Sequence, residues 1–116
     1  MLERFIRSVG YAAEGIGQAW SQGRNFRIQC GVAVAVFAAG FWLGVSPVDW
    51  AILLICVALV LSAEVFNTAI ERITDEIHHG HHPKAKLIKD LSAGAVLILS
   101  LFSAAVGMLI LLPKIL

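Results

Sequence analysis

The chain has 116 residues, of which 59% are hydrophobic and 15% charged, and its mean hydropathy is +0.82. This composition excludes an ordinary soluble domain and indicates a single integral membrane domain over residues 1–116. The net charge of +1 by itself says nothing about nucleic acid, and we expect no nucleic-acid partner. Cys30 and Cys56 both fall in apolar runs, which favours buried small side chains over a redox pair.

Residues 1–22 predict an amphipathic helix. Apolar side chains recur at helical spacing, and most polar side chains fall off that stripe. The stripe consists of Leu2, Phe5, Ile6, Val9, Ala13, Ile16 and Trp20. A helix of this kind typically lies in the membrane interface, with its apolar side facing the lipid chains.

Three apolar stretches follow, each long enough to cross a hydrocarbon core of ~30 Å. They are residues 28–48, 51–70 and 91–112. The first and third have no charged residue, and the second has none before Glu64. Pro47 and Asp49 are expected to form the turn between the first two spans. The sequence therefore predicts an all-α integral membrane fold with one interfacial helix and three transmembrane helices.

The basic residues are unevenly placed along the chain. They gather before the first span and between the second and third: Arg4, Arg7, Arg24, Arg27, Arg72, Lys84, Lys86 and Lys89. The connection between the first two spans has none, and the C-terminal tail has only Lys114. The positive-inside rule then predicts a cytoplasmic N-terminus, a cytoplasmic 72–90 connection and an outside C-terminus.

Glu64, Asn67 and Glu71 share one helix face, because they are spaced by three and four residues. A carboxylate at bilayer depth costs roughly 2.5–3.5 kcal/mol on insertion scales and by default indicates a functional site. The stripe therefore suggests a site that holds a cation or moves a proton. Helix packing in an oligomer and a solvated helix end remain alternatives, and Asn67 could also serve as an interhelical hydrogen-bonding residue.

A second polar cluster lies just before the third span. Lys89 could neutralise phosphate, and paired carboxylates could hold Mg²⁺ together with substrate phosphates. Lys84 and Lys86 fit the cytoplasmic edge of the membrane better than a phosphate site. Asp75 is expected to be solvated. The HHGHH segment at 78–82 fits an exposed polar turn better than a metal site. No Walker-type phosphate loop is present.

The strings EVFNTAIE at 64–71 and KDLSAGAV at 89–96 closely resemble the prokaryotic diacylglycerol kinase family, which includes undecaprenol kinases. The resemblance extends through GYAAEGIGQAW at 10–20 and RNFRI at 24–28, and it covers essentially the whole chain. It implies a homotrimeric lipid kinase of the bacterial inner membrane. Such an enzyme would transfer the γ-phosphate of ATP to a lipid alcohol with the help of Mg²⁺. Whether that lipid is diacylglycerol or undecaprenol stays open.

The resemblance also implies residue roles. Glu64 corresponds to the catalytic base, Asn67 belongs to the same catalytic stripe, and Glu71 corresponds to a metal ligand. The implied nucleotide contacts are Arg4, Tyr11, Gly80, His81, His82, Lys89 and Asp90. The implied lipid-pocket residues are Phe26, Arg27 and Trp42.

One position departs from the family pattern. Many relatives carry a Glu at position 23 that shares the metal with the position of Glu71, whereas this chain has Gly23. The side-chain oxygen of Gln22, water or the phosphates would have to fill the gap. Gln29 also replaces a frequent His. If residue 23 is helical, Gly23→Glu should tighten Mg²⁺ binding without harm to folding.

Two other functions use the same features. The acidic stripe would also suit a small ion or proton carrier, and the loss of a carboxylate at position 23 would suit a non-catalytic membrane assembly protein. Lys89 and Asp90 favour the kinase, because a cation carrier has little need of a phosphate partner.

Overall fold

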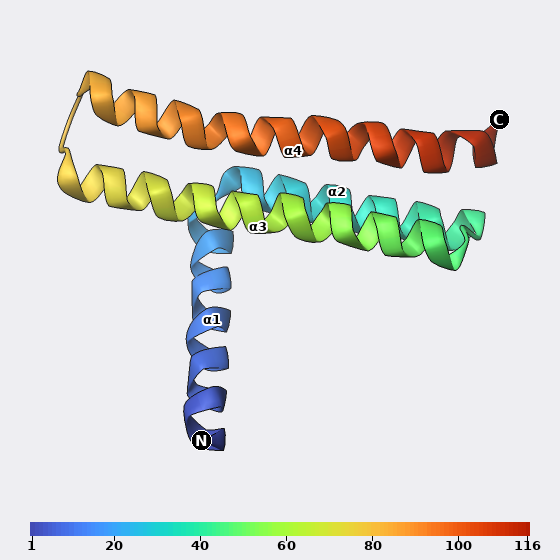
Figure 1. Cartoon of the computed structure of the whole chain (residues 1–116), viewed down its shortest axis with the longest axis horizontal. Coiled ribbons are helices and arrows are strands. Elements are labelled where there is room, and N and C mark those ends of the chain that lie inside the picture. Colours follow the sequence, from blue (N-terminus) through green and yellow to red (C-terminus); the bar gives the residue numbers. More distant parts are fainter.

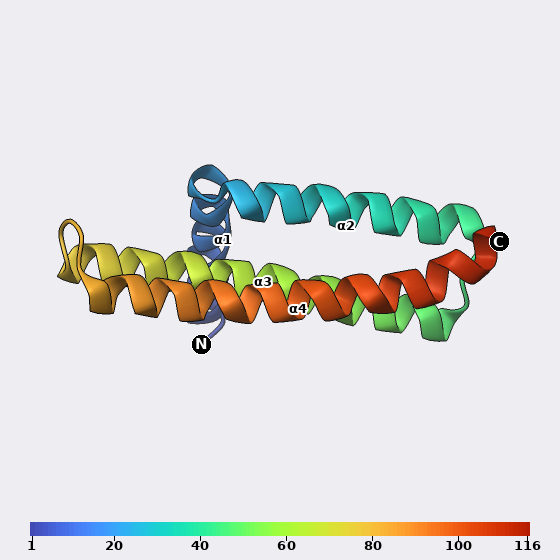
Figure 2. The same cartoon turned by 90° about the horizontal axis from the view of Figure 1, so that it is seen from above.

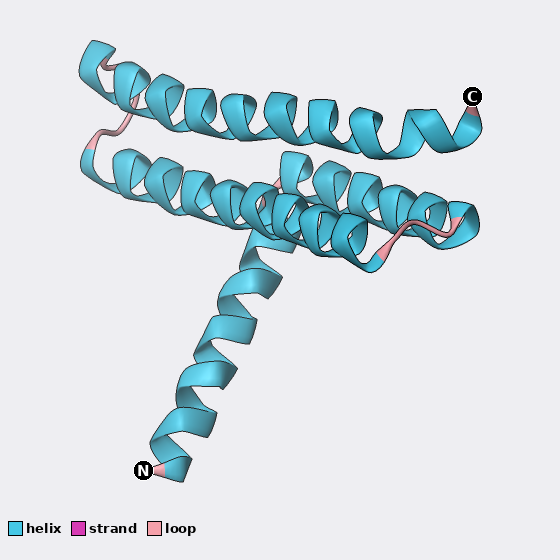
Figure 3. Ribbon diagram, turned by 45° about the vertical axis from the view of Figure 1, so that its right-hand side comes forward, coloured by secondary structure: helices cyan, strands magenta, loops and turns pink.

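The computed structural model describes all 116 residues and contains four α-helices joined by short loops (Figure 3). The helices are α1 (Leu2–Gln22), α2 (Arg24–Leu43), α3 (Pro47–Ile77) and α4 (Pro83–Ile115). α2, α3 and α4 run side by side, while α1 leaves the bundle at a steep angle (Figure 1). The last three helices are long and apolar enough to cross a membrane. The predicted all-α fold with three candidate spans is confirmed.

The turn between α2 and α3 lies earlier than expected. Gly44 adopts a left-handed conformation at φ 65° and ψ 49°, which glycine enters without steric cost and which ends α2. Ser46 then caps α3 by accepting a hydrogen bond from the backbone N–H of Asp49 at 3.1 Å. Pro47 occupies the first turn of α3, where its missing N–H is harmless. The prediction of a turn at Pro47 and Asp49 is therefore wrong.

α3 and α4 both extend beyond their apolar segments on the same side of the bundle. α3 continues to Ile77, and α4 begins at Pro83, where His82 Nδ1 accepts a hydrogen bond from the Lys84 backbone N–H at 3.2 Å. Hydropathy marks the part of a helix that suits lipid, whereas caps and prolines mark where the helix ends. The polar ends of α3 and α4 are therefore helical, and side chains of α3 can contact side chains of α4 there.

The bundle buries little apolar surface. Only 11 of 116 residues are buried, among them Ala33, Leu53 and Val60, while most large apolar side chains are exposed. So much exposed apolar surface is expected where lipid or another subunit covers the helices. Figure 2 shows α2 set apart from the α3 and α4 pair, and α3 has most of its tertiary contacts with α4.

A corner at Gly23 joins α1 to α2. Arg27 Nη1 donates hydrogen bonds to the backbone oxygens of Trp20 at 2.5 Å and Ser21 at 3.3 Å. These carbonyls belong to the last turn of α1 and have no partner within the helix. Arg27 therefore stabilises the corner by capping the helix that precedes it.

Gly23 itself is not helical. Its φ is −102° and its ψ is 98°, and a β-carbon there would lie 2.6 Å from the backbone oxygen of Ala19 and 3.1 Å from the β-carbon of Phe26. A backbone oxygen at the end of a helix cannot move aside cheaply. The condition under which position 23 was expected to accept Glu without harm to folding, a helical residue 23, is therefore not met.

We accordingly predict that Gly23→Glu and Gly23→Ala both destabilise the protein, by about 1–3 kcal/mol, because each introduces the same β-carbon into a filled space. Gly15→Ala, at a helical glycine of α1 where an added β-carbon meets nothing within 4 Å, is the matched control and should keep or raise wild-type stability. Thermal unfolding in detergent measures the three variants. A Gly23→Ala variant as stable as the wild type would contradict the prediction.

Candidate functional site

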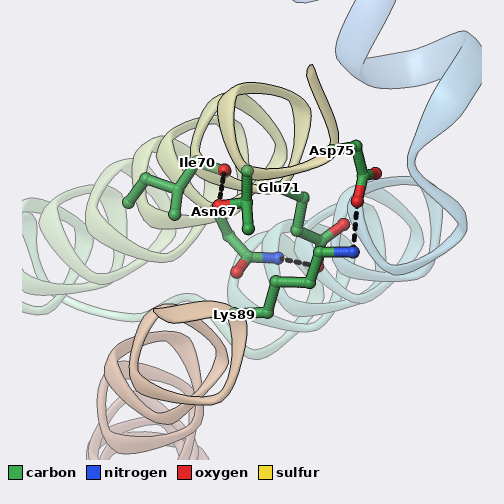
Figure 4. Close-up of polar contacts among 6 residues, drawn as sticks. Asn67, Ile70, Glu71, Asp75 and Lys89 are labelled. Carbon is green, nitrogen blue, oxygen red and sulfur yellow. Dashed lines mark hydrogen bonds and ion pairs between the residues drawn. The ribbon is translucent and has the colours of Figure 1, made fainter. Parts of the chain in front are cut away.

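The acidic stripe of α3 runs from a buried to an exposed position. Glu64 is 3% exposed and Asn67 is 9% exposed, although both are polar, and Glu71 reaches the surface. Figure 4 shows Asn67 and Glu71 on the side of α3 that faces α4. A stripe of this kind connects the interior of the bundle with the polar end of the α3 and α4 pair.

Asn67 is held by two hydrogen bonds that use both ends of its amide. Ser92 Oγ on α4 donates to Asn67 Oδ1 at 2.7 Å, and Asn67 Nδ2 donates to Glu71 Oε1 at 3.1 Å. Asn67 thus links two helices, as the packing alternative expects. The same bonds also fix one carboxylate oxygen of Glu71 and leave the other available to a ligand.

Lys89 reaches from α4 across to α3. Its ammonium forms an ion pair with Asp75 and passes beside the carboxylate of Glu71 (Figure 4). Glu71 and Asp75 are one helical turn apart, so the cation lies among the carboxylates that end the stripe. A cation and a carboxylate with a free oxygen at one place can hold phosphate and its counter-ion together.

Asp90 has a different partner from Lys89. It pairs at 2.6 Å with Lys86, one turn earlier on α4, and both side chains are largely exposed. An exposed pair with this spacing contributes only about 0.3–0.5 kcal/mol. Lys89 and Asp90, adjacent in sequence, therefore do not act as one pair in this structure.

Glu64 lines a pocket of about 240 Å³ between the three long helices. Asn25, Ile28 and Gln29 of α2 and Ala93 of α4 lie around the same space. No fully buried side-chain oxygen lacks a hydrogen-bond partner, so the carboxylate oxygens keep contact with this space. Half of the eight lining residues are polar. A carboxylate at the wall of such a pocket is suited to accept a proton from a hydroxyl placed there.

The residues implied as nucleotide contacts do not all gather at this site. Arg4 and Tyr11 are exposed on α1, which projects away from the bundle. Gly80, His81 and His82 lie in the loop between α3 and α4, next to the polar ends of both helices. Within this loop, the rings of His78 and His82 stack at 4.3 Å. The chain has no group of three or more His, Cys, Asp or Glu side chains that could hold a metal ion.

The three residues implied for the lipid pocket do not gather at one place, because Trp42 is distant from the other two. Phe26 is buried near the start of α2, Arg27 caps α1, and Trp42 is 86% exposed at the other end of α2. Trp42 is thirteen residues beyond Gln29, a distance of roughly 20 Å along a helix. None of the three lines the pocket beside Glu64.

The corner between α1 and α2 lies close to the end of the acidic stripe. Gln22 Oε1 accepts a hydrogen bond from Arg72, the residue that follows Glu71. The oxygen that was expected as a substitute metal ligand is therefore already engaged. Of the two residues expected to hold the metal, only Glu71 keeps a carboxylate oxygen free. This donor set fits Mg²⁺ that arrives with phosphates, since the ion needs only one or two protein carboxylates and keeps several waters.

Sequence reasoning missed two partners at the site. Asp75 is exposed, as expected, but it also pairs with Lys89, and Ser92 was not considered although it holds Asn67. Spacing places Asp75 on the face of Glu71 and Ser92 on the face of Lys89. It does not contain the contacts that these residues make with the other helix.

Comparisons with known proteins agree on one family. Residues 10–111 match the family model described as prokaryotic diacylglycerol kinase. Undecaprenol kinase of Bacillus subtilis is 40% identical over 113 residues, which cover 97% of this chain and 92% of that protein. Diacylglycerol kinase of Synechocystis is 37% identical over 94% of this chain and 63% of its own length. Diacylglycerol kinase of Escherichia coli K12 is 36% identical over 82% of this chain and 78% of its own length.

Proposed function

Because the chain belongs to the prokaryotic diacylglycerol kinase family and is a lipid kinase, we propose that it transfers the γ-phosphate of ATP to the hydroxyl of diacylglycerol or undecaprenol. The product would be phosphatidic acid or undecaprenyl phosphate. The observation that carries the proposal is the buried Glu64, which lies in a pocket on the same helix face as Glu71. An ion or proton carrier and a non-catalytic assembly protein have no comparable support.

In this proposal the residues along α3 have different roles. Glu64 accepts the proton of the lipid hydroxyl, while Glu71 and Lys89 meet the polyphosphate at the polar end. Asn67 keeps Glu71 in place through its hydrogen bond at 3.1 Å. Mg²⁺ bound by Glu71 and the phosphates would neutralise the developing charge. Phosphoryl transfer depends mainly on such positioning and charge stabilisation.

The remaining implied contacts belong to the same proposal. Asp90, Gly80, His81 and His82 lie on the polar side of the bundle and would contact the nucleotide there. Lys89 would exchange Asp75 for phosphate when ATP binds.

The two nucleotide contacts implied on α1 require that the protein forms a homotrimer. Arg4 and Tyr11 would reach a nucleotide in a homotrimer, in which α1 lies in the membrane interface beside a neighbouring subunit. The exposed apolar surface of all four helices supports both the interfacial position of α1 and the assembly.

Phosphorylation of both lipids, measured side by side in liposomes, tests the function. We expect radiolabel from the γ-phosphate of ATP in at least one lipid product, and none without Mg²⁺. ATP hydrolysis without a labelled lipid, or no reaction with either lipid, would overturn the proposal. The relatives above include kinases named for each lipid, so both substrates are needed.

The protein would lie in the bacterial inner membrane with its N-terminus and the α3–α4 loop in the cytoplasm. The turn between α2 and α3 and the C-terminus would then face outward, as the basic residues predict. We therefore expect Pro47→Cys to react with a membrane-impermeant maleimide in spheroplasts, with His81→Cys as the control that reacts only after permeabilisation. A cytosolic position 47 would reverse the orientation.

A further inference from the structure

Two spaces in the bundle meet at one pair of polar residues. The pocket beside Glu64 has a volume of about 240 Å³, and a second, mainly apolar cavity of about 430 Å³ lies between α2, α3 and α4. Gln29 of α2 and Ser100 of α4 line both spaces. A bound ligand that extends from Glu64 into the larger cavity therefore passes the side chains of Gln29 and Ser100. The larger cavity has the size of a small-molecule site, about 300–1,000 Å³.

Gln29 and Ser100 are joined across the bundle. Gln29 Nε2 donates a hydrogen bond to Ser100 Oγ at 3.1 Å. This bond leaves the second N–H of the Gln29 amide and the hydroxyl hydrogen of Ser100 as free donors. Thirteen of the 17 residues around the larger cavity are hydrophobic, so donors are scarce along this path. Polar groups in such surroundings are costly unless they find partners.

Diacylglycerol and undecaprenol differ in the groups that lie a few bonds from the hydroxyl that would be phosphorylated. In diacylglycerol, ester carbonyls lie within a few bonds of the hydroxyl and accept hydrogen bonds. In a polyprenol, the carbons next to the hydroxyl carry only hydrocarbon. With the hydroxyl at Glu64, an ester carbonyl would lie beside Gln29 and Ser100, whereas a polyprenol would present no acceptor there.

We propose that Gln29 and Ser100 form a specificity-determining pair that donates hydrogen bonds to an ester carbonyl of diacylglycerol, with one acyl chain in the cavity beyond. The proposal rests on the proposed function of the Glu64 site and deepens it. It assigns to Gln29 a role as substrate contact and predicts that the wild type uses diacylglycerol in preference to undecaprenol.

The test is the ratio of the two products when diacylglycerol and undecaprenol compete in the same liposomes. Gln29→Leu, Ser100→Ala and the double variant remove the donors. Loss of a partner for a buried carbonyl should lower kcat/KM for diacylglycerol by roughly tenfold to a hundredfold, while kcat/KM for undecaprenol changes by less than about threefold, below the loss of one typical hydrogen bond. Undecaprenol turnover in the same preparation shows that the variant is folded.

Two further variants separate recognition from packing. Ser100→Thr keeps the hydroxyl and should restore the wild-type ratio. Ser62→Ala removes an exposed hydroxyl from α3 that lines neither space, and should leave the ratio unchanged.

Two results would overturn the proposal and leave the kinase function intact. One is an equal loss with both lipids, which would show that the pair only joins the helices. The other is a wild type that phosphorylates undecaprenol and not diacylglycerol. No product from either lipid in the wild type would instead overturn the proposed function itself.

Discussion

Replacing Glu64 by Gln is expected to lower turnover by about 10²–10⁴-fold, the usual contribution of a general acid or base. Gln has nearly the same shape but cannot accept the proton of the lipid hydroxyl. Glu64 is 3% exposed and lies about two helical turns from Glu71, at the polar end of the stripe. The nucleotide would bind at that polar end, so ATP affinity should stay near the wild-type value.

The comparison variant for Glu64→Gln is Glu76→Gln. It makes the same chemical change at an exposed position on the same helix, where no side-chain partner is present. Transfer of radiolabel to lipid measures turnover, and equilibrium binding of a non-hydrolysable ATP analogue measures affinity. Thermal stability in detergent should not fall in either variant, since an amide is no costlier to bury than a carboxylate. A Glu64→Gln enzyme that keeps more than about a tenth of wild-type turnover would refute the assignment of the base.

The sequence predicted those parts of the site that depend on a single helix. Glu64, Asn67 and Glu71 share a face because their spacing matches the helical period, whatever packs against that face. The three long helices could be predicted for a similar reason, since apolar length alone indicates a span. The amphipathic pattern of residues 1–22 likewise gave the extent of α1, Leu2–Gln22.

Features that depend on two elements could not be predicted in this way. The bonds of Ser92 to Asn67 and of Gln29 to Ser100 need the relative positions of separate helices, which spacing within one helix does not contain. The corner at Gly23 was misjudged for the same reason. A side chain at position 23 would be costly because its β-carbon would meet the Ala19 carbonyl at the end of the preceding helix. Helix propensity does not include such a contact.

The second large effect is expected at the polar end of the stripe. Glu71→Ala and Lys89→Ala should each raise the apparent KM for Mg·ATP by roughly ten- to hundredfold, because each removes a charged partner of the phosphates worth about 1.5–3 kcal/mol. Glu71→Ala should also raise the Mg²⁺ concentration needed for half-maximal activity. Unchanged apparent affinities for Mg²⁺ and ATP in both variants would refute the site.

The ion pair of Lys89 with Asp75 provides the decisive comparison. If Lys89 serves only to join α4 to α3, then Asp75→Asn should impair the enzyme as much as Lys89→Ala, since either change removes the pair. If Lys89 serves the phosphates, Asp75→Asn frees the ammonium for ATP, and the apparent KM should stay the same or fall. Initial rates against ATP concentration for the two variants and the wild type distinguish these cases. A similar rise of KM in both variants would assign Lys89 to helix packing, and would leave Glu71 as the residue that binds the nucleotide through its metal.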